Sequence, residues 1–347
     1  MEDTKNPALI RRDFLKLGGT AAAGIIAGST LTTSANAMPP LPENPETTKA
    51  MPTRNLGKTG YKVGIFSLGG QASVEKKDND KIAVPIVERA LDLGVNYIDT
   101  AAFYGGGVSQ GYIGQVMKRR RKEAFLATKT HDRTKDGSLK LLDESLKLLQ
   151  TDHLDLWQLH NLSRMEELDR IFAKGGAIEA LQQARERKIV RYLGLTGHAD
   201  PEVLMEGIRR FPFDTVLMAL NAADKHHLSF IEKLLPMAVE KQMGIIGMKI
   251  PARGRILSTF TPPPAEEQRG WEGPAKSPGT LHIKEAMYYV LSLPVSTIII
   301  GCDSVAQLEQ NVQLAREFTP LNETQLASLA EKTAPVMRQA LFFRKWS

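Results

Sequence analysis

Four side chains with complementary proton chemistry stand where apolar stretches of the sequence pass into loops. They are a carboxylate, Asp99, a phenol, Tyr104, an ammonium, Lys129, and an imidazole, His160. A phenol with a pKa near ~10 keeps its proton at neutral pH, and a lysine beside it lowers that pKa and stabilises the phenolate. Each residue alone could cap a helix, line a rim, lie on the surface or fill the core. Together, at three successive apolar stretches and one following loop, they predict a single acid–base site.

The elements that must position these residues alternate between strand and helix. Eight short apolar stretches are predicted as strands: 65–69, 95–100, 125–130, 154–160, 190–196, 215–221, 244–249 and 297–301. Each is followed by apolar residues at helical spacing: 82–93, 109–121, 138–150, 177–188, 201–210, 228–242, 281–293 and 305–318. Such alternation implies parallel strands joined by crossover helices, and eight units predict a closed (β/α)8 TIM barrel of the α/β class.

The other arrangement of such units is an open, doubly wound sheet. It needs a glycine-rich phosphate turn after the first strand, and the residues at 68–71, LGGQ, match that turn poorly.

Residues 51–64 predict a β-hairpin ahead of the barrel, and 323–336 predict an additional C-terminal helix. We therefore expect one barrel domain over 51–347.

One connection is much longer than the others. Residues 250–280 are rich in proline and glycine and predict an active-site loop rather than an ordinary crossover. Arg253 and Arg255 at its start could bind an anionic substrate or a pyrophosphate, or could be simple surface charges.

Six stretches of the chain resemble the aldo-keto reductase superfamily. Most of them stand at successive strand positions in the order typical of that superfamily, and the likeness covers 51–335. The stretches are MPTRNLGKTGYKVGIFSLGG, NYIDTAAFYGG, ATKT, DLWQLH, GLTGH and IIGCDSVAQLEQN. The resemblance implies an oxidoreductase that interconverts a carbonyl compound (an aldehyde, a ketone or a sugar) and an alcohol by hydride transfer with NADP or NAD. The alternative is a non-catalytic nucleotide-binding barrel that acts as a sensor or partner-binding protein.

The resemblance also implies a role for each of the four residues. Hydride addition builds negative charge on the carbonyl oxygen, so Tyr104 would deliver a proton to it. Lys129 would tune the pKa of Tyr104. Asp99 would hold Lys129 and contact the cofactor, and His160 would orient the carbonyl oxygen.

The cofactor contacts implied by the resemblance lie mostly at the end of the eighth strand and the start of the next helix. They are Gly301, Asp303, Ser304, Gln307, Gln310 and Asn311. Relatives selective for NADPH usually carry an arginine or lysine there. The carboxylate of Asp303 would instead repel a 2′-phosphate and accept a bond from a free 2′-hydroxyl, so NAD and NADP both stay open. Met218 stands where many relatives bind the nicotinamide amide through glutamine, which leaves Thr196 and Asn221 as candidates.

Residues 1–37 resemble a twin-arginine translocation signal. Arg11-Arg12 precedes Phe-Leu-Lys and a dilute apolar stretch, and a small-x-small cleavage site follows at Ala35-Asn36-Ala37. We expect a signal peptide over 1–37, a Pro-rich linker over 38–50, and an exported, periplasmic protein that engages the twin-arginine export machinery. The apolar stretch is too short and dilute for a stable membrane span. The alternative is an amphipathic N-terminal helix that stays on the protein.

Composition narrows the remaining functions. The formal charge of +6 over 347 residues comes without zinc-finger spacing, aromatic-rich basic stretches or basic heptads, so we expect no nucleic-acid partner. The densest cationic run, KRRRK at 118–122, fits a solvated helix end. The single cysteine, Cys302, fits a small buried side chain. His198 and the pair His226-His227 have no acid at ligand spacing, so we expect no metal site.

Overall fold

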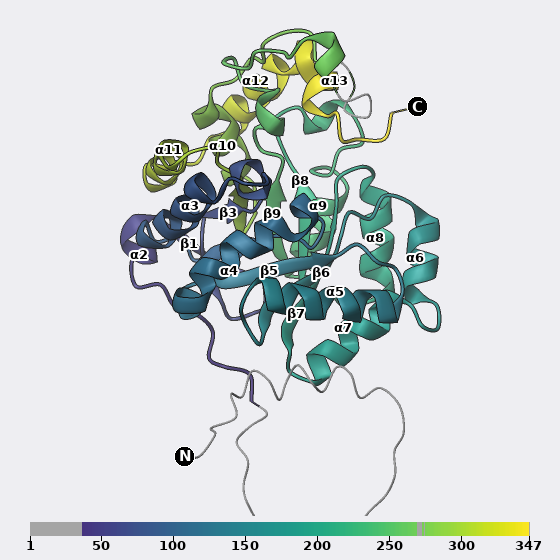
Figure 1. Cartoon of the computed structure of the whole chain (residues 1–347). Coiled ribbons are helices and arrows are strands. Elements are labelled where there is room, and N and C mark those ends of the chain that lie inside the picture. Colours follow the sequence, from purple (N-terminus) through teal and green to yellow (C-terminus); the bar gives the residue numbers. More distant parts are fainter. Residues whose placement is uncertain (1–36, 269–272, 274, 347) are drawn as a thin grey trace, which may run out of the picture.

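The computed structural model describes residues 37–268, 273 and 275–346, in which eight parallel strands close into a barrel (Figure 1). Neighbours in the barrel are neighbours along the chain, and the last strand pairs with the first. The strands are β3 (Phe66–Gly69), β4 (Tyr97–Asp99), β5 (Phe125–Thr130), β6 (Leu154–Leu159), β7 (Val190–Gly197), β8 (Thr215–Ala219), β9 (Gly244–Met248) and β10 (Thr297–Ile300). All eight predicted strands are present, and the predicted TIM barrel is confirmed.

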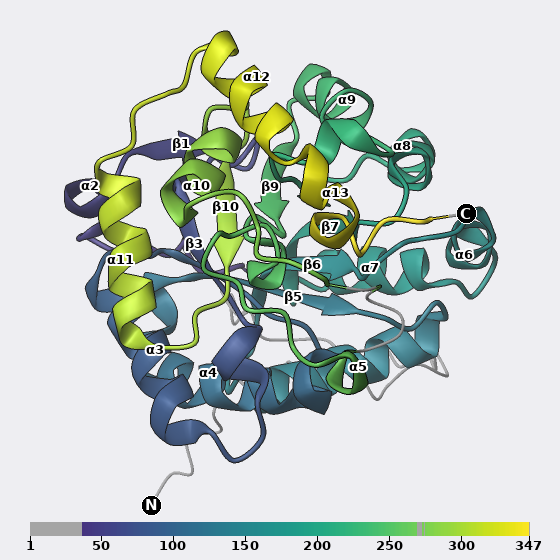
Figure 2. The same cartoon turned by 90° about the horizontal axis from the view of Figure 1, so that it is seen from above.

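Helices surround the strands, as the view from above shows (Figure 2). They are α3 (Asp80–Asp92), α4 (Val108–Arg120), α5 (Lys135–Leu148), α6 (Met165–Phe172), α7 (Ala177–Glu186), α8 (Pro201–Arg210), α9 (Leu234–Glu240), α10 (Ile283–Leu291) and α11 (Val305–Arg316). Three of them begin at a side chain that accepts a hydrogen bond from a backbone N–H in the first turn: Thr134, Asp200 and Ser304. Because helices cover their outer faces, the strands are almost entirely buried, and most of their residues are apolar.

The hairpin predicted over 51–64 forms and closes the amino-terminal end of the barrel. Its strands are β1 (Thr53–Asn55) and β2 (Lys62–Gly64). The side chain of Asn96, just before β4, accepts from the Gly64 N–H at 2.9 Å and donates to the Lys62 carbonyl at 2.9 Å. Tyr61 packs on Phe125 with ring centroids 4.7 Å apart. Aromatic side chains therefore fill this end, and the opposite end is left for chemistry.

Residues 38–50, predicted as a Pro-rich linker, pack against the barrel instead. The Glu43 N–H donates to the Lys122 carbonyl at 2.8 Å, and the Asn44 side chain donates to the Leu91 carbonyl at 2.7 Å. Arg191 donates to the carbonyl of Pro39, and the segment ends in the short helix α2 (Thr47–Ala50). A proline-rich stretch leaves backbone carbonyls and N–H groups without local partners, and here the barrel supplies partners for several of them. The linker prediction is therefore wrong about structure.

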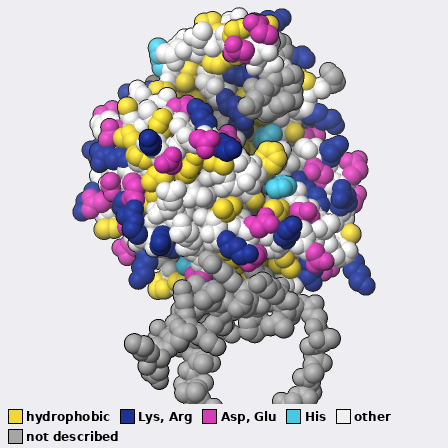
Figure 3. All heavy atoms as spheres, viewed as in Figure 1, with side chains coloured by type: hydrophobic (Ala, Val, Ile, Leu, Met, Phe, Trp, Pro, Cys, Tyr) yellow, Lys and Arg dark blue, Asp and Glu magenta, His cyan; other side chains and the backbone are white. Residues whose placement is uncertain are grey.

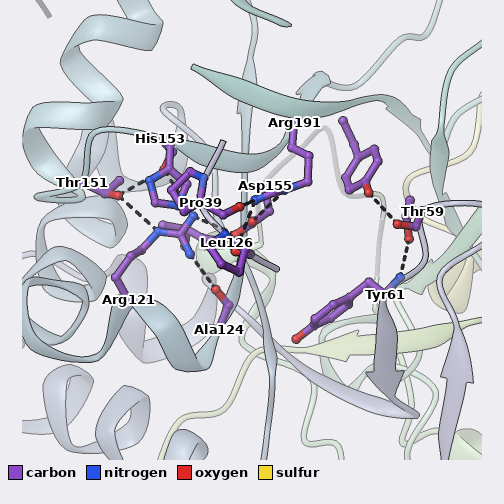
Figure 4. A network of polar contacts seen from close by, with 12 residues as sticks. Pro39, Thr59, Tyr61, Arg121, Ala124, Leu126, Thr151, His153, Asp155 and Arg191 are labelled. Carbon is purple, nitrogen blue, oxygen red and sulfur yellow. Dashed lines mark hydrogen bonds and ion pairs between the residues drawn. The ribbon is translucent and has the colours of Figure 1, made fainter. Parts of the chain in front are cut away.

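A buried carboxylate organises the end of the barrel on which this segment packs. Figure 4 shows Arg121 and Arg191 on opposite sides of Asp155, which is fully buried. Arg121 Nη2 lies 2.7 Å from Asp155 Oδ2. The neighbouring Arg120 forms ion pairs with three carboxylates at 2.6–3.2 Å. The cationic run 118–122 is thus largely paired with acids, and Figure 3 shows basic and acidic side chains interspersed over the visible face.

The C-terminal segment packs at the carboxyl ends of the strands. The helix predicted over 323–336 ends earlier, as α12 (Glu323–Lys332), and is followed by a 3-10 turn (Ala334–Val336) and α13 (Met337–Ala340). Thr333, just after α12, donates through its hydroxyl to the Ala222 carbonyl at 3.2 Å. Beyond α13 the chain lies over β7 and β8, where Arg344 Nη1 donates to the His198 carbonyl at 3.0 Å.

Asp224 connects this segment to the barrel. Its carboxylate forms an ion pair with Arg344, and neither side chain is exposed to solvent. The same carboxylate accepts from the Ser229 hydroxyl at 2.6 Å and from the Ile231 N–H at 3.0 Å. These bonds hold the stretch after Asp224 as a turn, which is why α9 begins at Leu234 and not at 228 as predicted.

The predicted signal over 1–37 lies outside the described residues except for Ala37. Within 37–268, 273 and 275–346, no helix combines the length and apolar character needed to cross a bilayer. The export prediction therefore keeps its support from sequence alone.

Candidate active site

The four side chains predicted to act together converge at the carboxyl ends of three neighbouring strands. Asp99 ends β4, Lys129 lies near the end of β5, and His160 directly follows β6. The parallel register of β4 with β5 and of β5 with β6 brings these ends to one edge of the barrel, where TIM barrels carry their sites. Tyr104 lies in the 3-10 turn after β4, Tyr104–Gly107.

A glycine makes that turn possible. Gly105 has a φ of 58°, and a Cβ there would lie 2.4 Å from the carbonyl oxygen of Glu75. Any side chain at this position would therefore meet both backbone strain and a backbone clash. The sequence Tyr-Gly-Gly-Gly is what lets the chain turn tightly enough to bring Tyr104 back over β5.

Lys129 is the centre of the hydrogen-bond network. Its Nζ donates to Asp99 Oδ1, to the Thr100 carbonyl at 2.8 Å and to the Tyr104 hydroxyl at 3.3 Å. Lys129 and Asp99 are 1% and 0% exposed, so water hardly screens their attraction. Burial lowers the pKa of Lys129, but Asp99 and Tyr104 outweigh burial and leave that pKa above its usual value. Lys129 is therefore a cation with all three donors used.

The phenol of Tyr104 is buried beside this cation. Burial raises the pKa of Tyr104, and the Lys129 charge opposes the rise without reversing it. The expectation that Lys129 would bring this pKa below its ordinary value is therefore not met, because desolvation of a phenolate at this depth is the larger effect. In this structure the phenol carries its proton at neutral pH.

His160 lies on the other side of the phenol. The two rings meet edge to face, with centroids 5.6 Å apart and an interplanar angle of 80°. Burial, followed by the positive charge of Lys129, lowers the pKa of His160 well below its usual value. A neutral imidazole can donate one hydrogen bond and accept another, which suits a group that binds a carbonyl oxygen next to Tyr104.

Two further polar side chains contact the second oxygen of Asp99, and sequence reasoning missed both. Asp99 Oδ2 accepts from Gln158 Nε2 at 3.1 Å and lies 3.4 Å from the Tyr97 hydroxyl. Both stand two positions before a site residue, Tyr97 before Asp99 and Gln158 before His160. The two-residue period of a strand puts such pairs on one face, and this was the signal that could have found them.

The rim beside the phenol is aromatic. Phe103 is 65% exposed, and its ring centroid lies 5.6 Å from that of His131 and 6.1 Å from that of His160. A substrate approaching Tyr104 from solvent would therefore pass an apolar ring.

The residues predicted to contact the adenosine phosphate lie around the start of α11. Gly301 follows β10, Ser304 caps α11 by accepting from the Gln307 N–H at 3.2 Å, and Gln310 is exposed one turn on. Asp303 is exposed, and its carboxylate lies 3.1 Å from Lys76 Nζ. A carboxylate at this helix N-terminus disfavours a second anion nearby.

Three other predicted contacts, Asn221, Asn311 and Thr196, are buried and make hydrogen bonds within the protein. Asn221 is 1% exposed and donates to the Ala340 carbonyl at 3.2 Å, so it fastens α13. Asn311 is 5% exposed and donates to Cys302 Sγ at 3.6 Å. Met218 is fully buried. Asn221 and Asn311 stay predictions as cofactor contacts. Thr196 is also buried, and its hydroxyl oxygen accepts from the Asn161 N–H at 2.8 Å.

Basic residues follow β9 in an unusual backbone conformation. Lys249 and Arg253 have φ of 63° and 56°, and strain of this kind in residues with side chains is often retained at functional sites. Burial lowers the pKa of His198 to about 3, and the charges of Lys249 and Arg253 contribute, so both cations lie near the end of β7. Arg255 instead is 4% exposed and packs over the Phe342 ring at 4.7 Å, as a structural residue.

The remaining residues singled out in the sequence have structural contacts. His226 bonds to the Ala330 carbonyl at 2.9 Å, and His227 stacks on Trp346 with centroids 3.9 Å apart. Burial raises the pKa of the Cys302 thiol to about 12. Among the residues that the structure describes, no three His, Cys, Asp or Glu side chains are grouped to hold a metal ion.

Comparison with known proteins agrees with this geometry. The chain is 30% identical over 293 residues to L-galactose dehydrogenase from Arabidopsis thaliana, covering 78% of this chain and 90% of that protein. It is 25% identical over 311 residues to the uncharacterized oxidoreductase YqkF from Bacillus subtilis, covering 82% and 97%. The holo form of the aldo-keto reductase AKR11C1 from Bacillus halodurans superimposes with a TM-score of 0.66 at 26% identity, covering 82% and 96%. The family model for the aldo/keto reductase family matches residues 62–334, so the chain belongs to that family and is an NAD(P)-dependent oxidoreductase acting on carbonyl compounds and alcohols.

Proposed function

We propose that Tyr104 is the general acid and base of this oxidoreductase. The observation that carries the proposal is Lys129 Nζ, which lies 3.3 Å from the Tyr104 hydroxyl and is anchored by Asp99. The phenol is protonated when a carbonyl arrives, and the cation beside it stabilises the phenolate left after proton transfer. In the reverse direction the phenolate accepts the proton of an alcohol.

The other two residues position the reacting groups. Asp99 keeps Lys129 charged and in place, and neutral His160 donates to the oxygen of the substrate, so that this oxygen lies between imidazole and phenol. The nicotinamide cofactor supplies or accepts the hydride. The residues around it suit such a group, because Lys249 and Arg253 provide cations for a pyrophosphate and α11 provides a helix N-terminus.

Within the two cofactors, we propose a preference for NAD(H). Asp303 stands where a 2′-phosphate would need a cation, and Lys76, 3.1 Å away, is paired with that carboxylate. A free 2′-hydroxyl can donate to Asp303, whereas a 2′-phosphate would be repelled by it.

We further propose a sugar or related polyhydroxy aldehyde as substrate. Support comes from relatives whose names specify such compounds, L-galactose dehydrogenase and the 6-dehydroglucose reductase of Novosphingobium aromaticivorans. The exposed Phe103 ring beside Tyr104 offers a face against which the C–H groups of a sugar ring pack.

The N-terminal motif supports a proposal about location. We propose that residues 1–37 direct export of the folded protein through the twin-arginine machinery into the periplasm, with the cofactor already bound. Free nicotinamide nucleotides are expected to be scarce outside the cytoplasm, so a tightly held cofactor would be regenerated by paired oxidation and reduction. Mass spectrometry of protein from the exported fraction should find the nucleotide. Protein confined to the cytoplasm when Arg11-Arg12 is intact would contradict export.

The catalytic assignment is tested with Tyr104→Phe. The probes are 4-nitrobenzaldehyde reduction with NADH and NADPH, and L-galactose oxidation with NAD and NADP. Loss of the proton donor should lower kcat by about 10²–10⁴-fold. The dissociation constant of the nucleotide should stay unchanged, since the phenol is not a phosphate ligand. Wild-type turnover by Tyr104→Phe would refute the role and favour a non-catalytic nucleotide-binding barrel.

A further inference from the structure

The carboxylate that anchors Lys129 has a second oxygen, and two neutral donors inside the barrel hold it. We propose that Gln158 and Tyr97 are positioning residues that keep Asp99 ionised and oriented, and thereby keep Lys129 against the Tyr104 hydroxyl. This inference rests on the proposed role of Tyr104 and extends the site by one layer into the barrel.

The geometry divides the two oxygens of Asp99 between two tasks. Oδ1 pairs with Lys129, and Oδ2 accepts from Gln158 Nε2 at 3.1 Å and lies within 3.4 Å of the Tyr97 hydroxyl. All of these side chains are buried. With both oxygens occupied, the carboxylate has one orientation, and that orientation fixes where Lys129 Nζ can lie.

The barrel makes room for Gln158 at a specific place. Gln158 is opposite Gly194 in the register of β6 with β7, and a Cβ on Gly194 would lie 3.0 Å from Gln158 Cγ. The same Cβ would lie 2.4 Å from Thr215 Oγ1, so a larger residue at 194 would crowd both the threonine and the glutamine. The absence of a side chain at Gly194 on β7 therefore leaves room for the long polar side chain of Gln158 on β6.

The other end of the Gln158 amide shows that packing alone does not explain this residue. Gln158 Oε1 is buried and has no hydrogen-bond partner within the described part of the chain. An unpartnered buried carbonyl is unfavourable, and methionine would fill the same slot without it. The hydrogen bond from Gln158 Nε2 to Asp99 is the contribution that glutamine makes and methionine cannot make.

The chemical effect passes from Asp99 to Lys129 and then to the phenol. Burial favours protonated Asp99, and Lys129, Gln158 and Tyr97 oppose this in that order. The charged or titratable groups around Asp99 are Lys129 on β5, Tyr97 on β4 itself and Tyr104 in the loop above, with His160 beyond Lys129. When the donor from Gln158 or Tyr97 is removed, Asp99 becomes protonated at a higher pH than in the wild type. The neutral carboxyl group then no longer forms an ion pair with Lys129.

Gln158→Met tests this, with Gln110→Met as a matched control. Gln110 is likewise buried, at 1% exposure, and its amide donates to two hydroxyls, Thr128 Oγ1 at 2.7 Å and Ser145 Oγ at 2.8 Å, away from the carboxylate. With the same probes, Gln158→Met should move the acid limb of the kcat profile up by about one pH unit, which corresponds to a tenfold change in the acid dissociation constant of Asp99. At pH values on that limb, kcat should therefore fall by about tenfold. KM and the nucleotide dissociation constant should stay constant. Gln110→Met should leave both kcat and the limb as in the wild type.

Tyr97→Phe is a second test of the inference, which can be used if Gln158→Met does not fold. Phenylalanine keeps the stack on Phe125, whose centroid lies 5.4 Å from that of Tyr97, and removes only the longer of the two contacts. It should move the acid limb in the same direction by a smaller amount. An unmoved limb in Tyr97→Phe and Gln158→Met, or an equal shift in Gln110→Met, overturns the inference. If those results come with an inactive Tyr104→Phe, the proposed function stands; if Tyr104→Phe keeps wild-type turnover, the proposed function itself is wrong.

Discussion

Replacing Lys129 with methionine should destabilise the protein as well as inactivate it. The substitution keeps the length of the side chain but removes the cation that pairs with Asp99 and donates to the Thr100 carbonyl at 2.8 Å. Both partners are at most 1% exposed, so the stranded carboxylate gains little from water. Loss of one member of a buried ion pair typically costs about 3–5 kcal/mol. We expect the free energy of unfolding to fall by that amount at pH 8.

The loss of unfolding free energy in Lys129→Met should be larger at high pH than at low pH. Burial already raises the pKa of Asp99 in the wild type, and without Lys129 it rises further. A carboxyl group whose pKa is higher in the folded than in the unfolded chain favours folding below the unfolded pKa, and that contribution is lost as pH rises through the folded pKa. The difference between Lys129→Met and the wild type should therefore be larger at pH 8 than at pH 5, by up to about 1.4 kcal/mol for each pH unit over which the proton is released.

Urea unfolding followed by circular dichroism at pH 5 and pH 8 measures this difference. The control is the double variant Asp99→Asn with Lys129→Met, which removes the stranded charge and should recover a large part of the lost stability. A loss of equal size at both pH values, with no recovery in the double variant, would show that Asp99 is not a buried charge held by Lys129.

Three further predictions test other parts of the structure. Asp303→Arg should lower the dissociation constant for NADPH by about tenfold or more relative to NADH in a fluorescence titration, since it replaces a repelling charge with an attracting one; an unchanged ratio would place the 2′-position of the ribose elsewhere. On α4, Gly111→Ala should stabilise the protein by up to about 1 kcal/mol, because nothing lies within 4 Å of the new Cβ, whereas Gly114→Ala would put its Cβ 1.9 Å from a carbonyl oxygen at the end of α5 and should lower the melting temperature sharply. Arg344→Met should strand the buried Asp224 carboxylate and cost about 3–5 kcal/mol, with faster proteolysis of the C-terminal segment; digestion at the wild-type rate would contradict its anchoring role.

The strands and the convergence of the four side chains could be read from the sequence because both follow from simple periodicity. Eight apolar runs separated by helical patterns have few alternatives to a barrel, and residues ending parallel strands must meet at one edge. The same rule, applied two residues earlier on each strand, would have found Tyr97 and Gln158.

What the sequence did not reveal depended on contacts between distant segments. The stretch at 38–50 has the composition of a linker, and contacts with distant parts of the chain make it part of the domain. Among them are the carbonyls of Leu91 and Lys122 and the guanidinium of Arg191. The hydrogen bond from Asn221 to the Ala340 carbonyl of α13 likewise joins residues far apart in the sequence. The pKa of Tyr104 depends on how deeply the phenol is buried, which residue spacing does not encode.

The two termini of the domain lie at opposite ends of the barrel. Pro39 is fixed to Arg191 beside the filled end, while Trp346 stacks on His227 at the end that carries Tyr104. A surface or resin coupled ahead of Pro39 would therefore leave the reactive end facing solution. A purification tag or fusion partner added after Ser347 would emerge at the same end of the barrel as Tyr104. For an immobilised biocatalyst or a biosensor, the amino-terminal side is the place of attachment.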